Sequence, residues 1–351
     1  MLFPTTYDMT LLISIISMIC WGSWANTLKM AGPKWRFELY YFDYSFGVLL
    51  AALAAAFTFG SMGPELSFQD NLLIAGKRQM AYAVAAGAVF NLANILLVGA
   101  ISIAGMSVAF PIGIGLALIT GTVGSYLQQK TGNPALIFGG TGVVLLAILF
   151  AALAYAAMNR PVAEPVTPVG VRPGNVKSAR RPGAAKGIII SVVSGLLMGA
   201  FYPLVTLARA QGLEVGLGPY AIAVFFAAGV FLTTIVYNIY FMNLPLHGEP
   251  VEFGAYLKGT AGQHLLGVIG GIIWCAGSVC NFVAGAVSGP AQVGPAVSYA
   301  LGQGATMVSV LWGLLVWREF AGAGTRAVIL IILMFLAFGT GLGMIAVSPL
   351  Y

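Results

Sequence analysis

The segment NRPVAEPVTPVGVRPGNVKSARRPGAAK, residues 159–186, interrupts a chain of 351 residues that is otherwise almost continuously apolar. It holds five prolines, a run of basic residues and few large apolar side chains, which predicts a flexible or polyproline-like tether. Five apolar runs lie on each side of it. Each run has about twenty residues, the length that a helix needs to cross about 30 Å of hydrocarbon. The sequence therefore predicts an all-α integral membrane protein with ten transmembrane helices.

The ten predicted spans cover most of the chain. They are expected near residues 9–30, 40–60, 80–100, 104–126, 134–158, 187–208, 219–242, 262–286, 290–316 and 325–348. Residues 1–158 would form a first five-helix repeat, residues 159–186 the linker, and residues 187–351 a second five-helix repeat. The composition agrees, because only 7% of the residues are charged, whereas a soluble domain has about 25%.

The basic residues lie between the apolar runs. If the N-terminus is outside, the cytoplasmic side carries 12 Lys and Arg residues and the outer side carries 4. Since Lys and Arg favour the cytoplasmic side, we expect a cell-membrane protein with both termini outside and the linker in the cytoplasm. The net charge of +6 then reflects membrane topology, and no nucleic-acid partner is expected. The basic part of the linker is either this orientation signal or a contact for anionic lipid.

An internal repeat relates the two halves. GAVFNLANILLVGAISIAGMSVAFPIG, residues 87–113, resembles GGIIWCAGSVCNFVAGAVSGPAQVGPAVS, residues 270–298. A single offset of 184 pairs Asn94 with Ser278. Because each half has an odd number of spans, the two repeats must be inverted relative to each other. Inverted repeats recur in secondary transporters, which bind their solute near the membrane midplane between the repeats.

Two further stretches resemble known transporters. CWGSWANTLKMAGPKWRFELYYFDYSFGVLLAALAAAFTFGS, residues 20–61, is similar to the opening of ureide-permease-like proteins. More broadly, the ten-span plan resembles the drug/metabolite transporter superfamily, which includes the glucose/ribose porters and the L-rhamnose proton symporter. WREFAGAGTRA, residues 317–327, resembles the acidic end-of-repeat motif of that superfamily, with Glu319 as the acid. The first-half counterpart, QQKTGNPAL, lacks the acid. The resemblance implies uptake or exchange of small polar solutes, often ureides, nucleobases or sugars, by alternating access.

Polar and aromatic residues inside the spans are candidates for a solute site. In the first span, Asn26 and Lys29 share one helical face and Trp24 lies on another. Asn26 could bond to a hydroxyl or amide of a solute, and Trp24 could support a flat ring. In the third span, Asn91 and Asn94 share a face near the membrane centre, where amides against lipid would be costly. Interhelical hydrogen bonding and packing are the alternative for all of them.

The second half supplies a similar set. Its candidate solute ligands are Tyr202, Trp274, Ser278, Asn281, Gln292 and Tyr299, and Gln303 and Thr306 continue the same polar wall. Pro111 and Pro295 each fall about one turn into a predicted helix, where proline removes a backbone hydrogen bond. These two positions are therefore predicted hinges.

Asp43 is the only acidic residue inside a predicted span. An ionisable residue there is costly unless it is paired or hydrated, so we expect it to be functional. It would carry the coupling proton, with Lys29 or Arg36 as its charge partner. Glu38, at the mouth of the same helix, is the competing proton carrier. The alternative is that both carboxylates merely fix the helix end at the headgroup level.

Missing motifs narrow the class of protein. The chain has no GxxxxGK sequence followed by Ser or Thr, and so no ATP site of that kind. It also lacks clustered His, Asp, Glu or Cys at a catalytic or metal-binding spacing. We therefore expect neither an enzyme nor a cofactor or metal site. His247 and His264 fall in or beside a loop, and no role is assigned to them.

The nearly uncharged spans limit the cargo. A small neutral polar solute, such as a sugar, ureide or nucleobase, fits amides, hydroxyls and aromatic faces best. Its symport with protons is expected, with sodium held by backbone carbonyls as an alternative. A multidrug or metabolite efflux carrier and an uncoupled facilitator are the other readings. Gly339 and Gly343 suit either a homodimer contact or packing within the chain.

Overall fold

The computed structural model describes residues 1–158, 184–209, 214–246 and 249–351, and within these residues it is all helical, with no β-strand. Nine helices of this part are long and apolar enough to cross a membrane. The long elements are α1 (Tyr7–Ser23) continued by α2 (Ala25–Ala31), α3 (Phe37–Phe57), α5 (Lys77–Ala104), α6 (Met106–Gln128), α7 (Pro134–Met158), α8 (Ala184–Arg209), α9 (Pro219–Asn243), α11 (Ala261–Ala286) and α14 (Thr325–Val347). The shorter elements are η1 (Phe59–Ser61), α4 (Phe68–Ile74), α10 (Gly254–Leu257), η2 (Gly289–Ala291), α12 (Pro295–Gly302), α13 (Ala305–Leu315) and η3 (Ser348–Leu350).

The ninth predicted span, residues 290–316, is broken into α12 and α13. Gly294 has φ +86° and precedes Pro295, which is the first residue of α12 and does not lie one turn inside a helix as expected. The helix is interrupted again at Gln303 and Gly304. All eight residues of α12 are buried, as irregular backbone at membrane depth requires. Within the described residues, α12 and α13 together take the place of the remaining predicted span, which is consistent with the ten that the sequence predicts.

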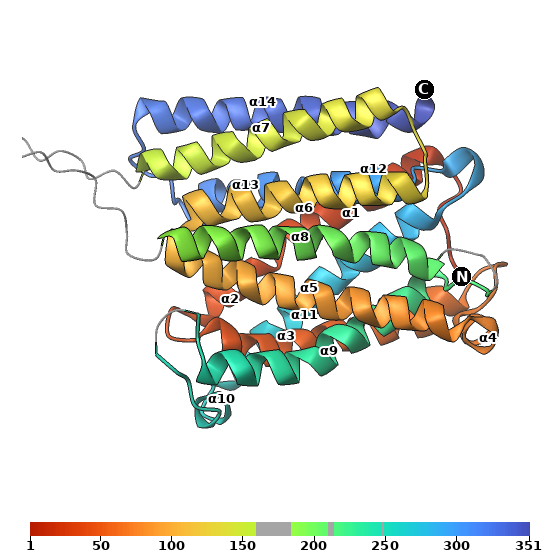
Figure 1. Ribbon diagram of the computed structural model, residues 1–351, viewed down its shortest axis with the longest axis horizontal. Coiled ribbons are helices and arrows are strands. Elements are labelled where there is room, and N and C mark those ends of the chain that lie inside the picture. Colours follow the sequence, from red (N-terminus) through yellow and green to blue (C-terminus); the bar gives the residue numbers. More distant parts are fainter. Residues whose placement is uncertain (159–183, 210–213, 247–248) are drawn as a thin grey trace, which may run out of the picture.

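Both termini lie at one end of the bundle, and Met158 and Ala184 lie at the other (Figure 1). We call these the termini end and the linker end. Most of the predicted linker, residues 159–183, lies outside the described residues. Its last three residues, 184–186, already belong to α8, so this helix begins earlier than predicted.

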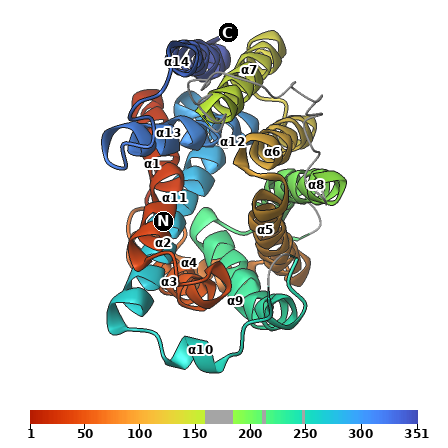
Figure 2. The same ribbon diagram turned by 90° about the vertical axis from the view of Figure 1, so that its left-hand side faces the viewer.

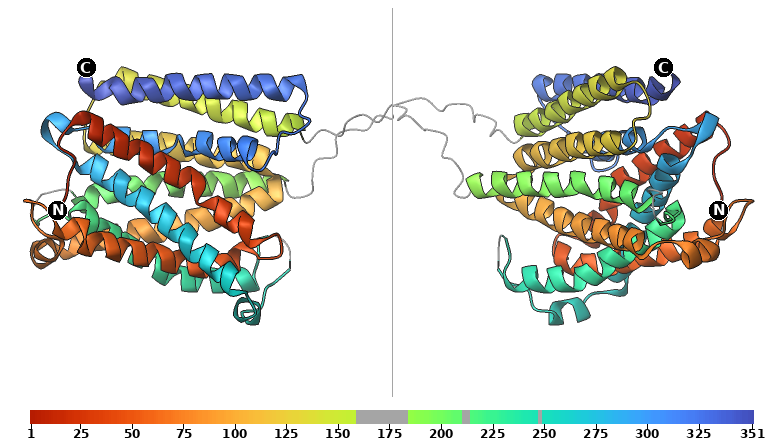
Figure 3. Two further views of the ribbon diagram at one scale, coloured as in Figure 1. Left: turned by 180° about the vertical axis from the view of Figure 1, so that it is seen from behind. Right: turned by 45° about the vertical axis from the view of Figure 1, so that its right-hand side comes forward.

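The helices pack around small residues. Figures 1 and 2 show α7 and α14 side by side along one edge of the bundle, where Gly140 and Gly341 face each other. Figure 3 shows α1 and α11 crossing the bundle as neighbours. By contrast, a side chain at Gly339 or Gly343 would meet no atom within 4 Å. Packing among the described residues therefore does not account for these two glycines.

Close contact between α5 and α9 depends on Gly229. A methyl group on Gly229 would lie 2.2 Å from the carbonyl oxygen of Val84. We expect Gly229→Ala to lower the free energy of unfolding by about 1–3 kcal/mol, the usual cost of overpacking. Thermal unfolding in detergent measures this. Gly343→Ala is the matched control, since its methyl group would enter open space, and equal melting temperatures for the two variants would contradict the close contact.

Candidate functional site

A cavity runs from the middle of the bundle toward the linker end. Its inner chamber has a volume of about 190 Å³ and its outer chamber about 380 Å³. The chambers are continuous, because Trp24, Asn94 and Thr306 line both. The outer chamber reaches Lys29 and Glu319, which follow α1 and α13 at the linker end. The volume of the outer chamber falls within the roughly 300–1,000 Å³ that is typical of small-molecule sites.

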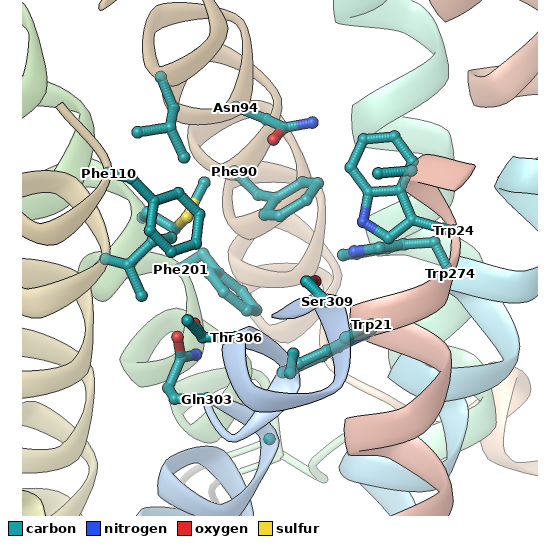
Figure 4. A pocket seen from close by; sticks show the side chains of 16 residues that line it. Trp21, Trp24, Phe90, Asn94, Phe110, Phe201, Trp274, Gln303, Thr306 and Ser309 are labelled. Carbon is teal, nitrogen blue, oxygen red and sulfur yellow. The ribbon is translucent and has the colours of Figure 1, made fainter. Parts of the chain in front are cut away.

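Six aromatic residues line the inner chamber (Figure 4). Trp274 of α11 is only 5% exposed and lies at the centre of the group. Its ring centroid is 4.5 Å from that of Phe90 and 6.1 Å from that of Trp21, which is nearly parallel to it. Trp24, Phe110 and Phe201 complete the aromatic wall. Such a wall favours a solute with a flat or apolar face.

Polar side chains interrupt this wall at two places. Asn94 donates from its amide nitrogen to the hydroxyl of Tyr41, at 3.0 Å, which leaves its carbonyl oxygen for a ligand. Gln303 and Thr306 lie where α12 and α13 are interrupted, and their side chains make no hydrogen bond to any other described residue. Amide and hydroxyl groups without a protein partner can donate to and accept from a polar solute.

An ion pair lies at the mouth of the cavity. The Lys29 Nζ is 2.5 Å from the Glu319 Oε1 and 4.4 Å from the ring centroid of Trp317. The indole N–H of Trp317 donates to the Asn26 Oδ1 at 2.6 Å. The Tyr155 hydroxyl donates to the second oxygen of Glu319 at 3.3 Å. The mouth therefore joins α2, α7 and the turn after α13.

The turn after α13 points these side chains toward Lys29. Arg318 has φ +51°, in the left-handed region that is uncommon for residues other than glycine. The backbone N–H of Glu319 donates to the Gly313 carbonyl at 2.9 Å, so the chain folds back over the end of α13. An unfavourable backbone conformation of this kind often occurs at functional sites.

Tyrosines close the cavity at the termini end. Tyr202 and Tyr299 are buried, with ring centroids 4.9 Å apart. The Tyr202 hydroxyl donates to the carbonyl oxygen of Asn281, and the Tyr299 hydroxyl donates to that of Ala117. Phe201, which lines the inner chamber, packs against both tyrosines. The cavity is therefore closed at the termini end and extends toward the linker end.

Asp43 lies apart from the cavity, between α3 and the first turns of α11. Its Oδ2 is 2.7 Å from the Nδ1 of His264, and its Oδ1 accepts from the Tyr256 hydroxyl at 2.7 Å. Burial raises the pKa of the Tyr256 hydroxyl, and its hydrogen bond to Asp43 raises it further, so Tyr256 stays protonated and remains a donor. The rings of Trp35 and His264 pack nearly perpendicular to each other, with centroids 5.4 Å apart.

The charge partner of Asp43 is not the one that the sequence predicts. Lys29 pairs with Glu319 and not with Asp43. Arg36 pairs with Glu38, at 2.5 Å. Both basic candidates therefore have other carboxylates, and the expectation that Lys29 is the charge partner of Asp43 is corrected.

His264, to which the sequence assigns no role, takes that place. α11 begins at Ala261, where Thr260 and Gln263 form a capping box. His264 thus belongs to the helix and turns toward α3, although hydropathy placed it beside the loop. His247 lies outside the described residues.

Comparison with known protein families finds a match over most of the chain. The family model for ureide permeases matches residues 40–166 and 176–348. The chain belongs to the ureide permease family. This confirms the family predicted from residues 20–61, and the chain is a multi-pass membrane transporter.

Individual relatives cover the chain to different extents. Ureide permease 1 of Arabidopsis thaliana is 24% identical over 92% of this chain and 93% of its own length. Probable ureide permease A3 of Vigna unguiculata is 29% identical over 39% of this chain and 38% of its own length. A solved crystal structure matches 96% of this chain and 98% of its own with a TM-score of 0.58. Its identity of 16% makes it evidence for the fold alone.

The structure separates the predicted solute ligands of this family member into two groups. Trp24, Asn26, Asn94 and Trp274 line the cavity. The others do not line it and bond to neighbouring helices or loops: Asn91, Tyr202, Ser278, Asn281, Gln292 and Tyr299. These six residues therefore make hydrogen bonds within the protein, which is the alternative to solute binding that the sequence also allows. Of the two predicted hinges, Pro111 lies inside the continuous helix α6 and Pro295 begins α12.

Proposed function

We propose that this ureide permease family member is a secondary carrier that binds a small neutral ureide-like solute in the cavity and exposes it to each side of the membrane in turn. One observation carries the proposal. The cavity combines aromatic walls with unpaired polar groups, and it is closed at the termini end by Tyr202 and Tyr299 while it extends toward the linker end. The relatives named ureide permeases support the choice of solute.

The lining fits the chemistry of a ureide. Such a solute is compact and uncharged, with amide N–H and C=O groups along its edges. Trp274 would support its face, and Gln303 and Thr306 would bond to its edge. The charged lining residues of the described part, Lys29 and Glu319, form a pair with no net charge. A neutral solute therefore needs no additional counter-charge.

We assign the coupling proton to Asp43, with Glu38 as the alternative carrier. A buried carboxylate that faces an imidazole can pass a proton to it and take one back. Two tyrosines near Asp43 in the sequence of α3 bond to helices that line the cavity. The Tyr40 hydroxyl lies 2.7 Å from Thr27 of α2, and the Tyr41 hydroxyl accepts from Asn94 of α5. We infer that a change of charge at Asp43 acts on α2 and α5 through these tyrosines.

Uptake into proteoliposomes tests the function. Allantoin or uracil should accumulate under an inward proton gradient, and collapse of the gradient should abolish the accumulation. For one coupled proton, a gradient of one pH unit supports about tenfold accumulation, because one unit corresponds to about 1.4 kcal/mol. Sugars serve as competitors in the same assay. Entry without accumulation would indicate an uncoupled facilitator, and export of cationic dyes without ureide uptake would indicate an efflux carrier.

A further inference from the structure

Two contacts between equivalent positions join the two halves of the chain, one at each end of the cavity. At the linker end, Lys29 in the last turn of α2 bonds to Glu319, which follows α13. At the termini end, Arg209, the last residue of α8, donates to the Gln129 Oε1 at 2.5 Å, directly after α6. Each contact joins the end of the first crossing of one half to the end of the fourth crossing of the other (Figure 1).

The two contacts differ in their surroundings. The side chains of Lys29 and Glu319 are 43% and 33% exposed, so water screens their attraction and the pair contributes little to stability. Arg209 is partly buried and also donates to the carbonyl of Gly285. The termini end is therefore closed by hydrogen bonds that water screens less.

The hydrogen-bond acceptor also differs between the two contacts, as their exposure to water does. The screened contact uses a carboxylate, Glu319, and the partly buried contact uses a neutral amide, Gln129. A carboxylate at position 129 would form an ion pair with Arg209 in partly buried surroundings, where charge-assisted bonds are stronger than neutral ones and breaking one costs more than it does in open water. The missing acid of QQKTGNPAL thus has a physical explanation.

We propose that Lys29–Glu319 and Arg209–Gln129 are the two gates of the carrier, and that the neutral amide of Gln129 is what allows the termini-end gate to open. This inference rests on the proposed carrier function. In the structure the termini-end gate is closed, because Arg209 bonds to both Gln129 and the Gly285 carbonyl, and the buried rings of Tyr202 and Tyr299 pack against Phe201 of the inner chamber. A neutral acceptor keeps its opening rapid, whereas the linker-end gate tolerates a full ion pair because water screens it.

The test compares Gln129→Glu with Gln128→Glu. Gln128 is the adjacent, exposed glutamine, so the control adds the same charge without the Arg209 contact. Both are made in a protein whose three cysteines are replaced by alanine and which carries Ala25→Cys, a reporter that lines both chambers. A membrane-impermeant thiol reagent is applied from each side of sealed vesicles. Allantoin uptake and equilibrium binding are measured on the same variants.

Gln129→Glu should slow labelling from the termini side, and uptake, by about fivefold or more, the effect of exchanging a neutral for a charge-assisted hydrogen bond. Labelling from the linker side and equilibrium binding should stay within about twofold of the starting protein, since neither requires the termini-end gate to open. Gln128→Glu should behave as the starting protein does. Gln129→Ala should act in the opposite direction and speed labelling from the termini side.

The possible results distinguish an error in the proposed gates from an error in the proposed solute. If the starting protein binds no allantoin but Gln129→Glu still slows labelling from the termini side alone, the gates stand and the proposed solute is wrong. If allantoin is transported and Gln129→Glu labels and transports as Gln128→Glu does, the gates are wrong and the proposed function stands. Slower labelling of Gln129→Glu from both sides would also overturn the proposal, because a general closure of the cavity is not a gate.

Discussion

Trp274→Ala should weaken binding of the transported ureide by about tenfold to a hundredfold, because removing an aromatic platform beneath a stacked ring costs roughly 1–3 kcal/mol. We expect this large loss of binding because of the position of Trp274. It lines the inner chamber and packs against Phe90 and Trp21, whose ring centroids lie 4.5 and 6.1 Å from its own. Equilibrium binding of radiolabelled allantoin to the purified protein measures the loss.

Two comparisons make this result specific. Trp312→Ala removes a tryptophan that is 37% exposed and lines neither chamber, so it should bind as the unmodified protein does. Thr306→Val keeps the shape of the wall and removes one unpaired hydroxyl, so it should weaken binding even if Trp274→Ala folds poorly. Equal losses in Trp312→Ala and Trp274→Ala would show that the effect does not come from the cavity.

The second large effect is expected at Asp43. Asp43→Asn should abolish accumulation driven by a proton gradient, a loss of about tenfold under one pH unit, while exchange of labelled for unlabelled solute continues. The amide keeps the size of the side chain and can still contact His264 and Tyr256, but it cannot take up a proton. Uptake and exchange in proteoliposomes, measured side by side, separate coupling from movement of the solute.

Glu38→Gln is the matched comparison, since it neutralises a carboxylate on the same helix. Glu38 is held by Arg36 in a contact of 2.5 Å, and we expect this variant to retain gradient-driven accumulation. The opposite pattern, with accumulation retained in Asp43→Asn and lost in Glu38→Gln, would show that Glu38 and not Asp43 carries the coupling proton. Accumulation in both variants would exclude both carboxylates as carriers of the coupling proton.

Local patterns in the sequence predict much of the fold and part of the site. Apolar runs of membrane length identify the crossings, because in lipid only a helix satisfies its own backbone. Helical spacing places Asn26 and Lys29 on one face, and both line the outer chamber. Trp24, Asn94 and Trp274, which the sequence predicts as solute ligands, also line the cavity. These inferences required only the periodicity of a helix and the cost of polar groups against lipid.

Contacts between distant residues were not accessible in this way. Lys29 and Glu319 are 290 residues apart, and Asp43 and His264 are 221 residues apart. Sequence spacing says nothing about which helices become neighbours, so it pairs Lys29 with the wrong carboxylate. The buried tyrosines show a related difficulty. The ring of Tyr299 closes the cavity and its hydroxyl bonds to a backbone carbonyl, but the same residue type would suit a solute ligand equally well.

The distribution of indole rings gives the protein an intrinsic optical signal. Trp21, Trp24, Trp274 and Trp317 line the cavity or its mouth, and they are four of the six tryptophans in the chain. Indole emission responds to polarity and to nearby quenching groups, so entry of a solute or exposure of the mouth to water changes the fluorescence of most emitters together. Stopped-flow mixing can therefore resolve solute entry and release in real time without any attached dye.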